Sequence, residues 1–199
     1  MTTFLLIRHG DNDYLGRALA GWTPGIHLNA RGREQAERLA GRLASSGAVA
    51  VYSSPLERTR ETAEPIARRL GLEVRILEAL GEVRIGEWTG RTFEELRQDK
   101  RWRLFNSFRG CARIPGGETM LEVQQRMAAA IEEMRCAHPE GTVIAVSHAD
   151  PIRAILCHYL GMPLDLIHRL EIGTASVSEI RLGDDWAQVT RINVSEELP

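Results

Sequence analysis

Short, continuously apolar runs alternate along this chain with longer segments of helical periodicity. The first run covers residues 4–7 and ends at Arg8 and His9, and later runs cover residues 48–52 and 142–147. A run without alternating polar residues is typical of a strand that is buried on both faces. The order of strands and helices predicts an α/β fold, a three-layer sandwich with a mainly parallel central sheet and helices on both faces.

Helices are predicted between these strands. A stripe of apolar residues at i, i+3, i+4 and i+7 follows Asn29, which suits an N-cap. The sequence from Ser54 to Glu57 predicts a second helix start, with Ser54 as the N-cap and Glu57 as the capping-box glutamate. Gly71 is expected to end that helix.

The remaining expected elements are two helices (118–138 and 150–159), a short strand (74–77) and a C-terminal hairpin (175–182 and 186–192). Residues 100–117 mix arginine, aromatic residues and glycine without a clear period, and they look like an insertion. Because the chain has 199 residues, of which 43% are apolar, we expect a single domain over residues 1–199.

The charged residues nearly cancel, with 25 Lys and Arg against 27 Asp and Glu. The chain therefore has no overall field that favours a nucleic acid or membrane partner, and any anion binding must be local. No apolar run approaches the ~20 residues of a membrane span, and the N-terminus lacks a signal-peptide pattern, so a cytoplasmic location is expected. Cys111, Cys136 and Cys157 are interpreted as reduced packing residues.

Residues that can bind an anion or carry a positive charge follow three of the predicted strands. They are Arg8, His9, Ser53, Ser54, Arg58 and His148. Ligands of parallel sheets bind beyond the carboxyl ends of the strands, and a phosphomonoester dianion needs charge-assisted donors such as guanidinium groups. A neutral imidazole is also a competent nucleophile. The pattern indicates a phosphate site at this edge of the sheet.

Six motifs along the chain, in the expected order, resemble those of the histidine phosphatase superfamily, which has the phosphoglycerate mutase-like fold. They are Arg8-His9-Gly10, residues 28–36, residues 53–63, residues 80–90, Pro115-Gly116-Gly117-Glu118 and Val146-Ser147-His148. The match spans nearly the whole chain. It is therefore much more specific than Arg-His-Gly alone.

The resemblance implies a role for each residue of the expected site. His9 would be the nucleophile, and Glu82 would be the general acid that later activates water. Arg8, Arg58 and His148 would form the phosphate pocket. Because guanidinium groups stabilise the phosphoryl charge, neither a metal nor another cofactor is expected. The two arginines should also favour a neutral His9 by like-charge repulsion.

Two carboxylates rival Glu82 in this role. Glu78 and Glu87 are close to it in sequence, but only position 82 fits the motif. The ordinary interpretation of both rivals is that they belong to a solvated loop.

The chain departs from the family's pattern after both histidines. The glutamate that usually follows Arg-His-Gly is Asp11, the next residue is Asn12, and Leu15 stands where an asparagine is often found. Asn12 could still hydrogen-bond the phosphate or the substrate. Ala149 can offer its backbone N–H, and Asp150 is expected to cap its helix.

The other histidines, aromatic residues and arginines receive ordinary interpretations. No metal site is predicted, because partners at ligand spacing are lacking for His27, His138, His158 and His168. Packing in the core or in a lid is expected for Trp22, Trp102, Phe105 and Phe108. The arginines of residues 97–113 are expected to be solvated.

The expected function is that of a metal-independent phosphomonoesterase that hydrolyses a small phosphate ester through a phosphohistidine. A phosphoglycerate mutase would use the same His9 chemistry, but the family's mutases usually have a longer chain. A non-catalytic protein that binds phosphorylated ligands is a third hypothesis, which the presence of both His9 and Glu82 disfavours. The sequence does not identify the physiological substrate, because variable loops recognise the leaving group. It also leaves a homodimer open.

Overall fold

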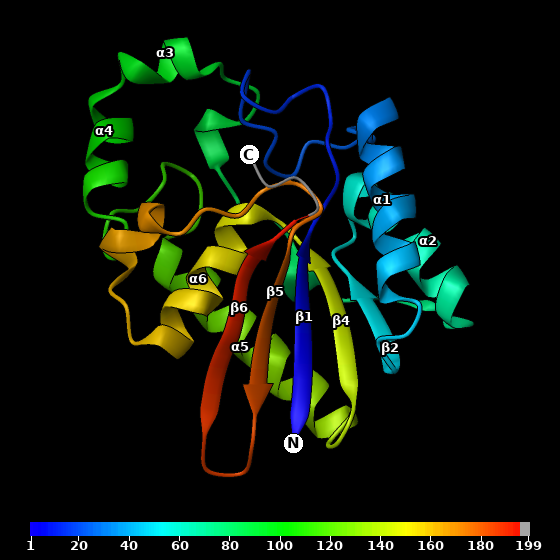
Figure 1. Ribbon diagram of the computed structural model, residues 1–199. Coiled ribbons are helices and arrows are strands. Elements are labelled where there is room, and N and C mark those ends of the chain that lie inside the picture. The colour runs from blue at the N-terminus through cyan, green and yellow to red at the C-terminus, as the bar shows by residue number, and fades with distance from the viewer. Residues whose placement is uncertain (196–199) are drawn as a thin grey trace.

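The described part of the chain, residues 1–195 of a computed structural model, is built around a six-stranded sheet (Figure 1). The strands are β1 (Thr2–Arg8), β2 (Ala48–Ser53), β3 (Val74–Ile76), β4 (Thr142–Ser147), β5 (Val177–Leu182) and β6 (Ala187–Val194). Their order is β3-β2-β4-β1-β5-β6. The first four pair in parallel, and β5 and β6 add an antiparallel edge. The prediction of an α/β fold with a mainly parallel sheet is therefore confirmed.

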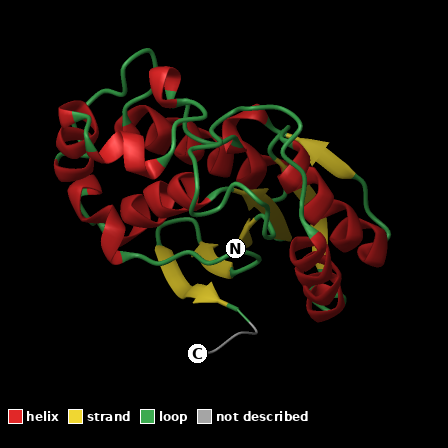
Figure 2. Cartoon of the chain, turned by 90° about the horizontal axis from the view of Figure 1, so that it is seen from above, coloured by secondary structure: helices red, strands yellow, loops and turns green. Residues whose placement is uncertain are grey.

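Helices cover both faces of the sheet (Figure 2). One face carries α1 (Ala30–Leu43) and α2 (Glu57–Leu70), and the other carries α5 (Met120–Ala137) and α6 (Ala149–Leu160). Strand β1 contributes to both cores, because successive side chains of a strand point to opposite faces. Leu5 and Ile7 pack under α1 and α2, whereas Phe4 and Leu6 pack under α5 and α6. Burial on both faces explains the continuously apolar run.

Several shorter helices connect these layers. They are α3 (Phe93–Arg97), α4 (Lys100–Ser107) and the 3-10 helices η1 (Glu78–Leu80), η2 (Gly86–Trp88) and η3 (Leu164–Arg169). α3 and α4 lie beyond the carboxyl ends of the parallel strands, at the top of Figure 1. The stretch interpreted as an insertion, residues 100–117, thus begins with a helix, and Asp99 is its N-cap.

The start of α1 follows the prediction, whereas the start of α2 does not. Asn29 caps α1 as expected, since its side chain accepts a hydrogen bond from the Gly32 N–H. The assignment of Ser54 and Glu57 as a capping box is wrong, because α2 begins after Leu56 and has no side-chain cap. The Ser54 hydroxyl is engaged elsewhere, with Thr59 and His148. Gly71 ends α2 in the left-handed conformation, with φ of 69°.

The C-terminal half agrees more closely with the sequence pattern. A capping box formed by Thr119 and Glu122 starts α5, and His148 occupies the N-cap position of α6. The expected role of Asp150 as a helix cap is wrong, because its carboxylate pairs with two arginines instead. The predicted C-terminal hairpin is present as β5 and β6.

The cysteines only partly follow the prediction. All three are free, but Cys111 and Cys136 are exposed, and only Cys157 is a buried packing residue. Within residues 1–195, no helix is long and apolar enough to cross a membrane. The expectation of a single domain extends to residues 196–199, which lie outside the described residues, and it stays a prediction.

Candidate active site

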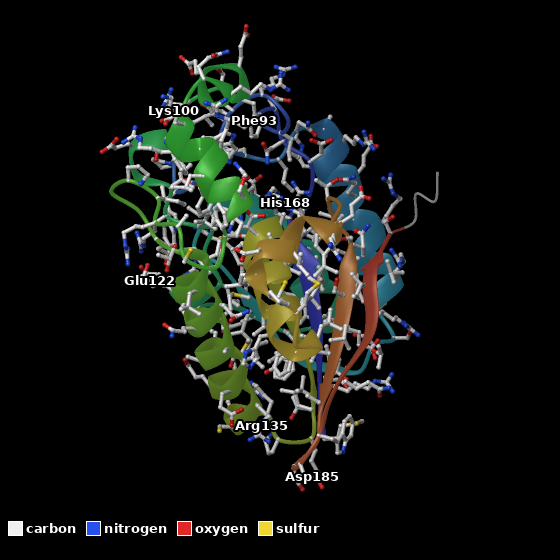
Figure 3. All side chains as sticks on the ribbon, turned by 90° about the vertical axis from the view of Figure 1, so that its left-hand side faces the viewer. Phe93, Lys100, Glu122, Arg135, His168 and Asp185 are labelled. Atoms are coloured by element: carbon white, nitrogen blue, oxygen red, sulfur yellow. The ribbon has the colours of Figure 1, made fainter. Side chains whose placement is uncertain are left out.

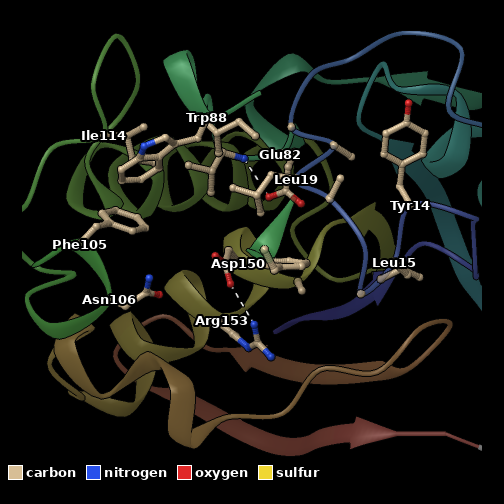
Figure 4. Close-up of a pocket in the computed structure, with 18 of the residues that line it drawn as sticks. Tyr14, Leu15, Leu19, Glu82, Trp88, Phe105, Asn106, Ile114, Asp150 and Arg153 are labelled. Atoms are coloured by element: carbon tan, nitrogen blue, oxygen red, sulfur yellow. Dashed lines mark hydrogen bonds and ion pairs between the residues drawn. The ribbon is translucent and has the colours of Figure 1, made fainter. Parts of the chain in front are cut away.

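The residues predicted to form the site meet at a pocket of about 300 Å³ beyond the carboxyl ends of β1 and β4 (Figure 4). The residues from the sequence prediction that line it are Arg8, His9, Asn12, Arg58, Glu82 and Ala149. His148 lies immediately behind this lining, fully buried, with its ring centroid 5.2 Å from that of His9. The rivals of Glu82 lie elsewhere, because Glu78 and Glu87 are exposed side chains in surface ion pairs.

His9 is held in a defined orientation at the end of β1. Its Nδ1 lies 2.7 Å from the carbonyl oxygen of Gly10, and its backbone N–H donates to Ser147. Because a carbonyl oxygen can only accept, Nδ1 carries the proton in this hydrogen bond. A neutral His9 ring therefore keeps its lone pair on Nε2. A nucleophile attacks through such a free lone pair.

The surroundings of His9 favour the neutral imidazole. Its side chain is almost fully buried, and this burial lowers the pKa of His9 well below the ordinary value. The positive charges of Arg58 and Arg8 lower the same pKa further, whereas the hydrogen bond to Gly10 opposes the shift. The arginines therefore act on His9 as the sequence predicted, although desolvation is the larger cause.

Arg8 and Arg58 bring two guanidinium groups to the pocket with part of their hydrogen-bonding capacity unused. Nη1 of Arg8 donates to Ile172 O at 2.6 Å, and Nη2 of Arg58 donates to Gly21 O at 2.8 Å. Among the described residues, the buried Arg8 Nε and Arg58 Nη1 have no partner. A buried donor without an acceptor is costly, so these atoms suit an anion.

His148 is fixed from the side away from the pocket. Its Nε2 lies 2.9 Å from the Ser54 hydroxyl, while its buried Nδ1 has no hydrogen-bond partner among the described residues. Burial lowers the pKa of His148 well below its ordinary value, and the charge of Arg58 adds to the shift. Ala149 follows it at the first position of α6, where a backbone N–H has no acceptor within the helix. This end of the pocket suits an anion.

Glu82 places a carboxyl group on the same pocket. Its Oε2 lies 3.8 Å from Nδ1 of His148, and its Oε1 accepts a hydrogen bond from Val83 N–H. Burial raises the pKa of Glu82, and the negative charge of Asp150 raises it further, while Arg58 opposes the shift. A raised pKa keeps a larger fraction of this carboxyl protonated, as a general acid requires.

The backbone around Glu82 is anchored by Arg126 of α5. This guanidinium donates to the carbonyl oxygens of Ala79, Gly81 and Glu82 at 2.6, 2.8 and 3.0 Å, and its Nε pairs with Glu118 at 2.9 Å. Trp22 also donates to the Glu82 carbonyl, at 2.5 Å. The position of the candidate acid thus depends on residues distant in sequence.

Asn12 lines the pocket from the loop that follows β1. It is 4% exposed, and its side-chain oxygen accepts from Tyr14 N–H, so its amide nitrogen remains available toward the pocket. This loop lies against the start of α1, where a Cβ atom on Gly32 would come within 2.1 Å of the Asp11 carbonyl oxygen. Only glycine allows that close approach.

Three charged residues of the pocket were not identified as site residues from the sequence. Arg109 Nη1 lies 2.8 Å from Asp150 Oδ2, and Arg153 Nη1 lies 2.9 Å from Asp150 Oδ1. Burial raises the pKa of Asp150, but the two guanidinium groups outweigh this effect and lower it. The expectation that the arginines of residues 97–113 are solvated is wrong for Arg109, which is 3% exposed.

Aromatic and aliphatic residues form another wall of the pocket. Figure 4 shows Trp88, Phe105 and Ile114 grouped on one side of it. Trp88 and Trp102 pack edge to face, with ring centroids 5.2 Å apart. The expected packing role of Trp102 and Phe105 is confirmed, and both also line the pocket, whereas Phe108 is exposed.

The other histidines lie apart from one another. His27 pairs with Glu61, His138 contacts the Tyr52 hydroxyl, and His168 lines the outer part of the pocket. Among residues 1–195, no group of three or more His, Cys, Asp and Glu side chains is arranged to hold a metal ion.

The chain is similar to known proteins both in sequence and in fold. The model of the histidine phosphatase superfamily (branch 1) matches residues 4–195. Phosphoserine phosphatase 1 of Hydrogenobacter thermophilus is 32% identical over 206 residues, which cover 100% of this chain and 95% of that protein. A probable phosphoglycerate mutase, GpmB, of Escherichia fergusonii is 31% identical over 98% of this chain and 94% of its own. A phosphoserine phosphatase of Entamoeba histolytica, crystallised with 3-phosphoglyceric acid, has a TM-score of 0.89 at 27% identity, covering 98% of each chain.

Proposed function

Because the chain belongs to the histidine phosphatase superfamily, we propose that it is a metal-independent phosphomonoesterase that works through a phosphohistidine at His9. The observation that carries the proposal is the combination of a buried His9, protonated on Nδ1, with donors on Arg8 and Arg58 that have no hydrogen-bond partner within residues 1–195. A neutral nucleophile beside fixed positive donors is what phosphoryl transfer requires.

The first step transfers the phosphoryl group to His9. Nε2 of His9 attacks phosphorus, the bond from phosphorus to the ester oxygen breaks, and Glu82 gives its proton to the departing oxygen. Nε of Arg8 and Nη1 of Arg58 donate to the phosphoryl oxygens, where charge develops as the bond breaks. The raised pKa of Glu82 supports its role as the acid.

The second step regenerates the enzyme. Glu82, now a carboxylate, takes a proton from a water molecule, whose oxygen attacks the phosphorus. The bond from His9 Nε2 to phosphorus breaks, and inorganic phosphate leaves. His148 supports both steps by donating from Nδ1 to the phosphoryl group when the Ser54 hydroxyl donates to Nε2. One pocket therefore serves both half-reactions.

Small phosphate esters are the proposed substrates. Relatives are named as phosphoserine phosphatases, and one of them was crystallised with 3-phosphoglyceric acid. A cavity of about 300 Å³ is at the lower end of the range typical of small-molecule sites. No cofactor is proposed, and a homodimer stays a prediction.

A phosphoglycerate mutase is the second candidate function. Its basis is the 31% identity to a probable mutase, of which this chain covers 94%. Chain length therefore does not distinguish the two functions for that relative. Product analysis with 3-phosphoglycerate does: a phosphatase releases inorganic phosphate and glycerate, whereas a mutase forms 2-phosphoglycerate.

The metal-free route is tested by dialysing the purified protein against EDTA and measuring phosphate release from a panel of esters. We expect full activity after dialysis, because the arginines supply the charge stabilisation that metal ions give to metallophosphatases. Loss of activity that added Mg²⁺ or Zn²⁺ restores would overturn this part of the proposal.

The acid role of Glu82 is tested with Glu82→Gln in single-turnover experiments. Phosphorylation of His9 by an alkyl ester should slow by roughly 10²- to 10⁴-fold, whereas an aryl ester with an acidic leaving group should lose much less. Glu87→Gln, a change in an exposed ion pair, is the matched control and should alter neither rate. Equal losses for both esters would remove Glu82 from the acid role.

A further inference from the structure

A second charged cluster, consisting of Arg109, Asp150 and Arg153, lines the pocket, and the proposed phosphoryl transfer gives none of the three a contact with the phosphoryl group. Arg109 comes from the segment after α4, whereas the other two belong to the first turns of α6. Figure 4 shows Asp150 joined to Arg153 on the pocket wall. The cluster lies within electrostatic range of the phosphate end, because the charges of Arg153 and Asp150 both influence the pKa of Arg8.

Arg109 is immobilised and holds the cluster in position. Its Nη1 donates to Asp150, its Nη2 donates to Asn106 at 2.8 Å, and its guanidinium lies over the Phe105 ring, 4.3 Å from the centroid. Its side chain is only 4% exposed. Arg109 therefore fixes Asp150, but both of its terminal nitrogens are already occupied.

Arg153 has a donor to spare. Its Nε donates to Leu170 O at 2.8 Å and its Nη1 donates to Asp150. Within residues 1–195, its Nη2 has no hydrogen-bond partner, and the side chain is 20% exposed and lines the pocket. A guanidinium held by two fixed acceptors presents its remaining N–H groups at little further entropic cost.

The charge of the cluster selects the kind of group that it would bind. Two guanidinium groups and one carboxylate leave a net charge of plus one. At the phosphate end, Arg8 and Arg58 supply plus two, which matches a phosphate dianion while Glu82 is protonated. A ligand that balances both ends carries a dianion and, on its leaving group, a single further negative charge.

We propose that Arg153 is a specificity residue that binds a carboxylate on the leaving group, so that the pocket takes phosphate esters of small hydroxy acids. This inference rests on the proposed function in placing the phosphate at His9. The apolar wall of Trp88, Phe105 and Ile114 covers the short carbon skeleton between the two anionic groups. A carboxylate accepts from Arg153 Nη2 in a charge-assisted hydrogen bond.

The test measures binding to the His9→Ala protein, which cannot turn the ester over. Calorimetry compares 3-phosphoglycerate with glycerol 3-phosphate, which has the same number of carbon atoms but no carboxylate. We expect the carboxylate ester to bind at least about tenfold more tightly, the size of a charge-assisted hydrogen bond. Arg153→Met in the same background should bring the ratio close to one, and Arg153→Lys should restore part of it.

Arg135→Met is the matched control, because Arg135 is paired with Glu132 at the opposite end of the molecule (Figure 3). It should retain the full preference. Equal binding of the two esters by the His9→Ala protein would overturn the inference, as would a preference that survives Arg153→Met. Tighter binding of propane-1,3-diyl bisphosphate than of 3-phosphoglycerate would overturn the assignment of a single negative charge.

Two further measurements keep the outcomes separate. Circular dichroism checks the fold of each variant, and Arg153→Gln replaces Arg153→Met if the latter does not fold. Hydrolysis of p-nitrophenyl phosphate by the unsubstituted protein tests the proposed function independently. Failure of hydrolysis with the binding preference intact would refute the phosphatase and support the carboxylate site. Hydrolysis without any binding preference would support the phosphatase and refute the carboxylate site.

Discussion

The Nε2 atom of His148 lies 2.9 Å from the Oγ atom of Ser54, at the bottom of the pocket. Both side chains are fully buried, and the same hydroxyl lies 2.7 Å from Thr59 Oγ1. A hydroxyl can donate or accept, so Ser54 can adapt to either tautomer of His148. When it donates to Nε2, the Nδ1 atom carries the proton and can donate to a phosphoryl oxygen.

Ser54→Ala should therefore lower kcat/KM by about tenfold, since a buried Nε2 loses its partner and His148 loses its orientation. The binding of inorganic phosphate, measured as competitive inhibition, should weaken in parallel. Ser53→Ala is the matched control, because Ser53 is equally buried but its hydroxyl donates to the Ser54 carbonyl and does not contact His148. Equal effects of the two substitutions would show that Ser54 acts through packing alone.

Asp150→Asn should move the alkaline limb of the pH profile to lower pH. Glu82 must be protonated to cleave an alkyl ester, so the rate falls as pH rises through its raised pKa. Asp150 contributes to raising that pKa, and removing its negative charge lowers it again. The measurement is the single-turnover rate of phosphorylation against pH, in which the ionisation of the ester itself is common to both proteins.

The control for this profile is Asp165→Asn, which changes an exposed carboxylate bonded to Gly110 N–H. It should leave the alkaline limb in place. On the acid side the His9 imidazole should remain neutral to well below pH 6.5, because burial and the two arginines lower its pKa. An alkaline limb that stays fixed or rises in Asp150→Asn would contradict this account of Glu82.

Arg126→Met should destabilise the protein by about 3 kcal/mol, because it breaks a largely buried ion pair with Glu118 and removes the guanidinium that donates to the carbonyls of Ala79, Gly81 and Glu82. Urea unfolding measures the change. Arg135→Met, which removes a partly exposed arginine of the same helix, should leave the midpoint nearly unchanged. Similar losses for both would show that Arg126 does not anchor the Glu82 segment.

The sheet and the phosphate end of the pocket could be predicted from the sequence because their signals are local. Phe4 to Ile7 is a continuous apolar run that ends at Arg8 and His9, and the sheet then brings His148 to the same edge. The carboxyl ends of parallel strands lie at the same edge of the sheet, so residues that directly follow different strands in the sequence lie together in the site.

The leaving-group end could not be predicted in this way. Arg109 and Asp150 are 41 residues apart and meet only because the segment after α4 folds over the start of α6. In sequence, Arg109 is one of several arginines in a stretch without periodicity, and Asp150 looks like a helix cap. The predicted capping role of Ser54 is wrong for a related reason. Its hydroxyl could bond either the N-terminus of the nearby helix or His148, and the sequence does not show that the fold brings His148 within reach.

His9 is expected to carry the phosphoryl group during turnover. The direct measurement is rapid mixing with a radiolabelled phosphate ester, a quench in alkali within milliseconds, and mapping of the labelled peptide. Phosphohistidine survives alkali and is lost in acid. We expect acid-labile label on His9 that appears before phosphate is released and is absent from His9→Ala. Turnover with no label on His9, or a His9→Ala protein of near-full activity, would show that His9 does not carry the phosphoryl group.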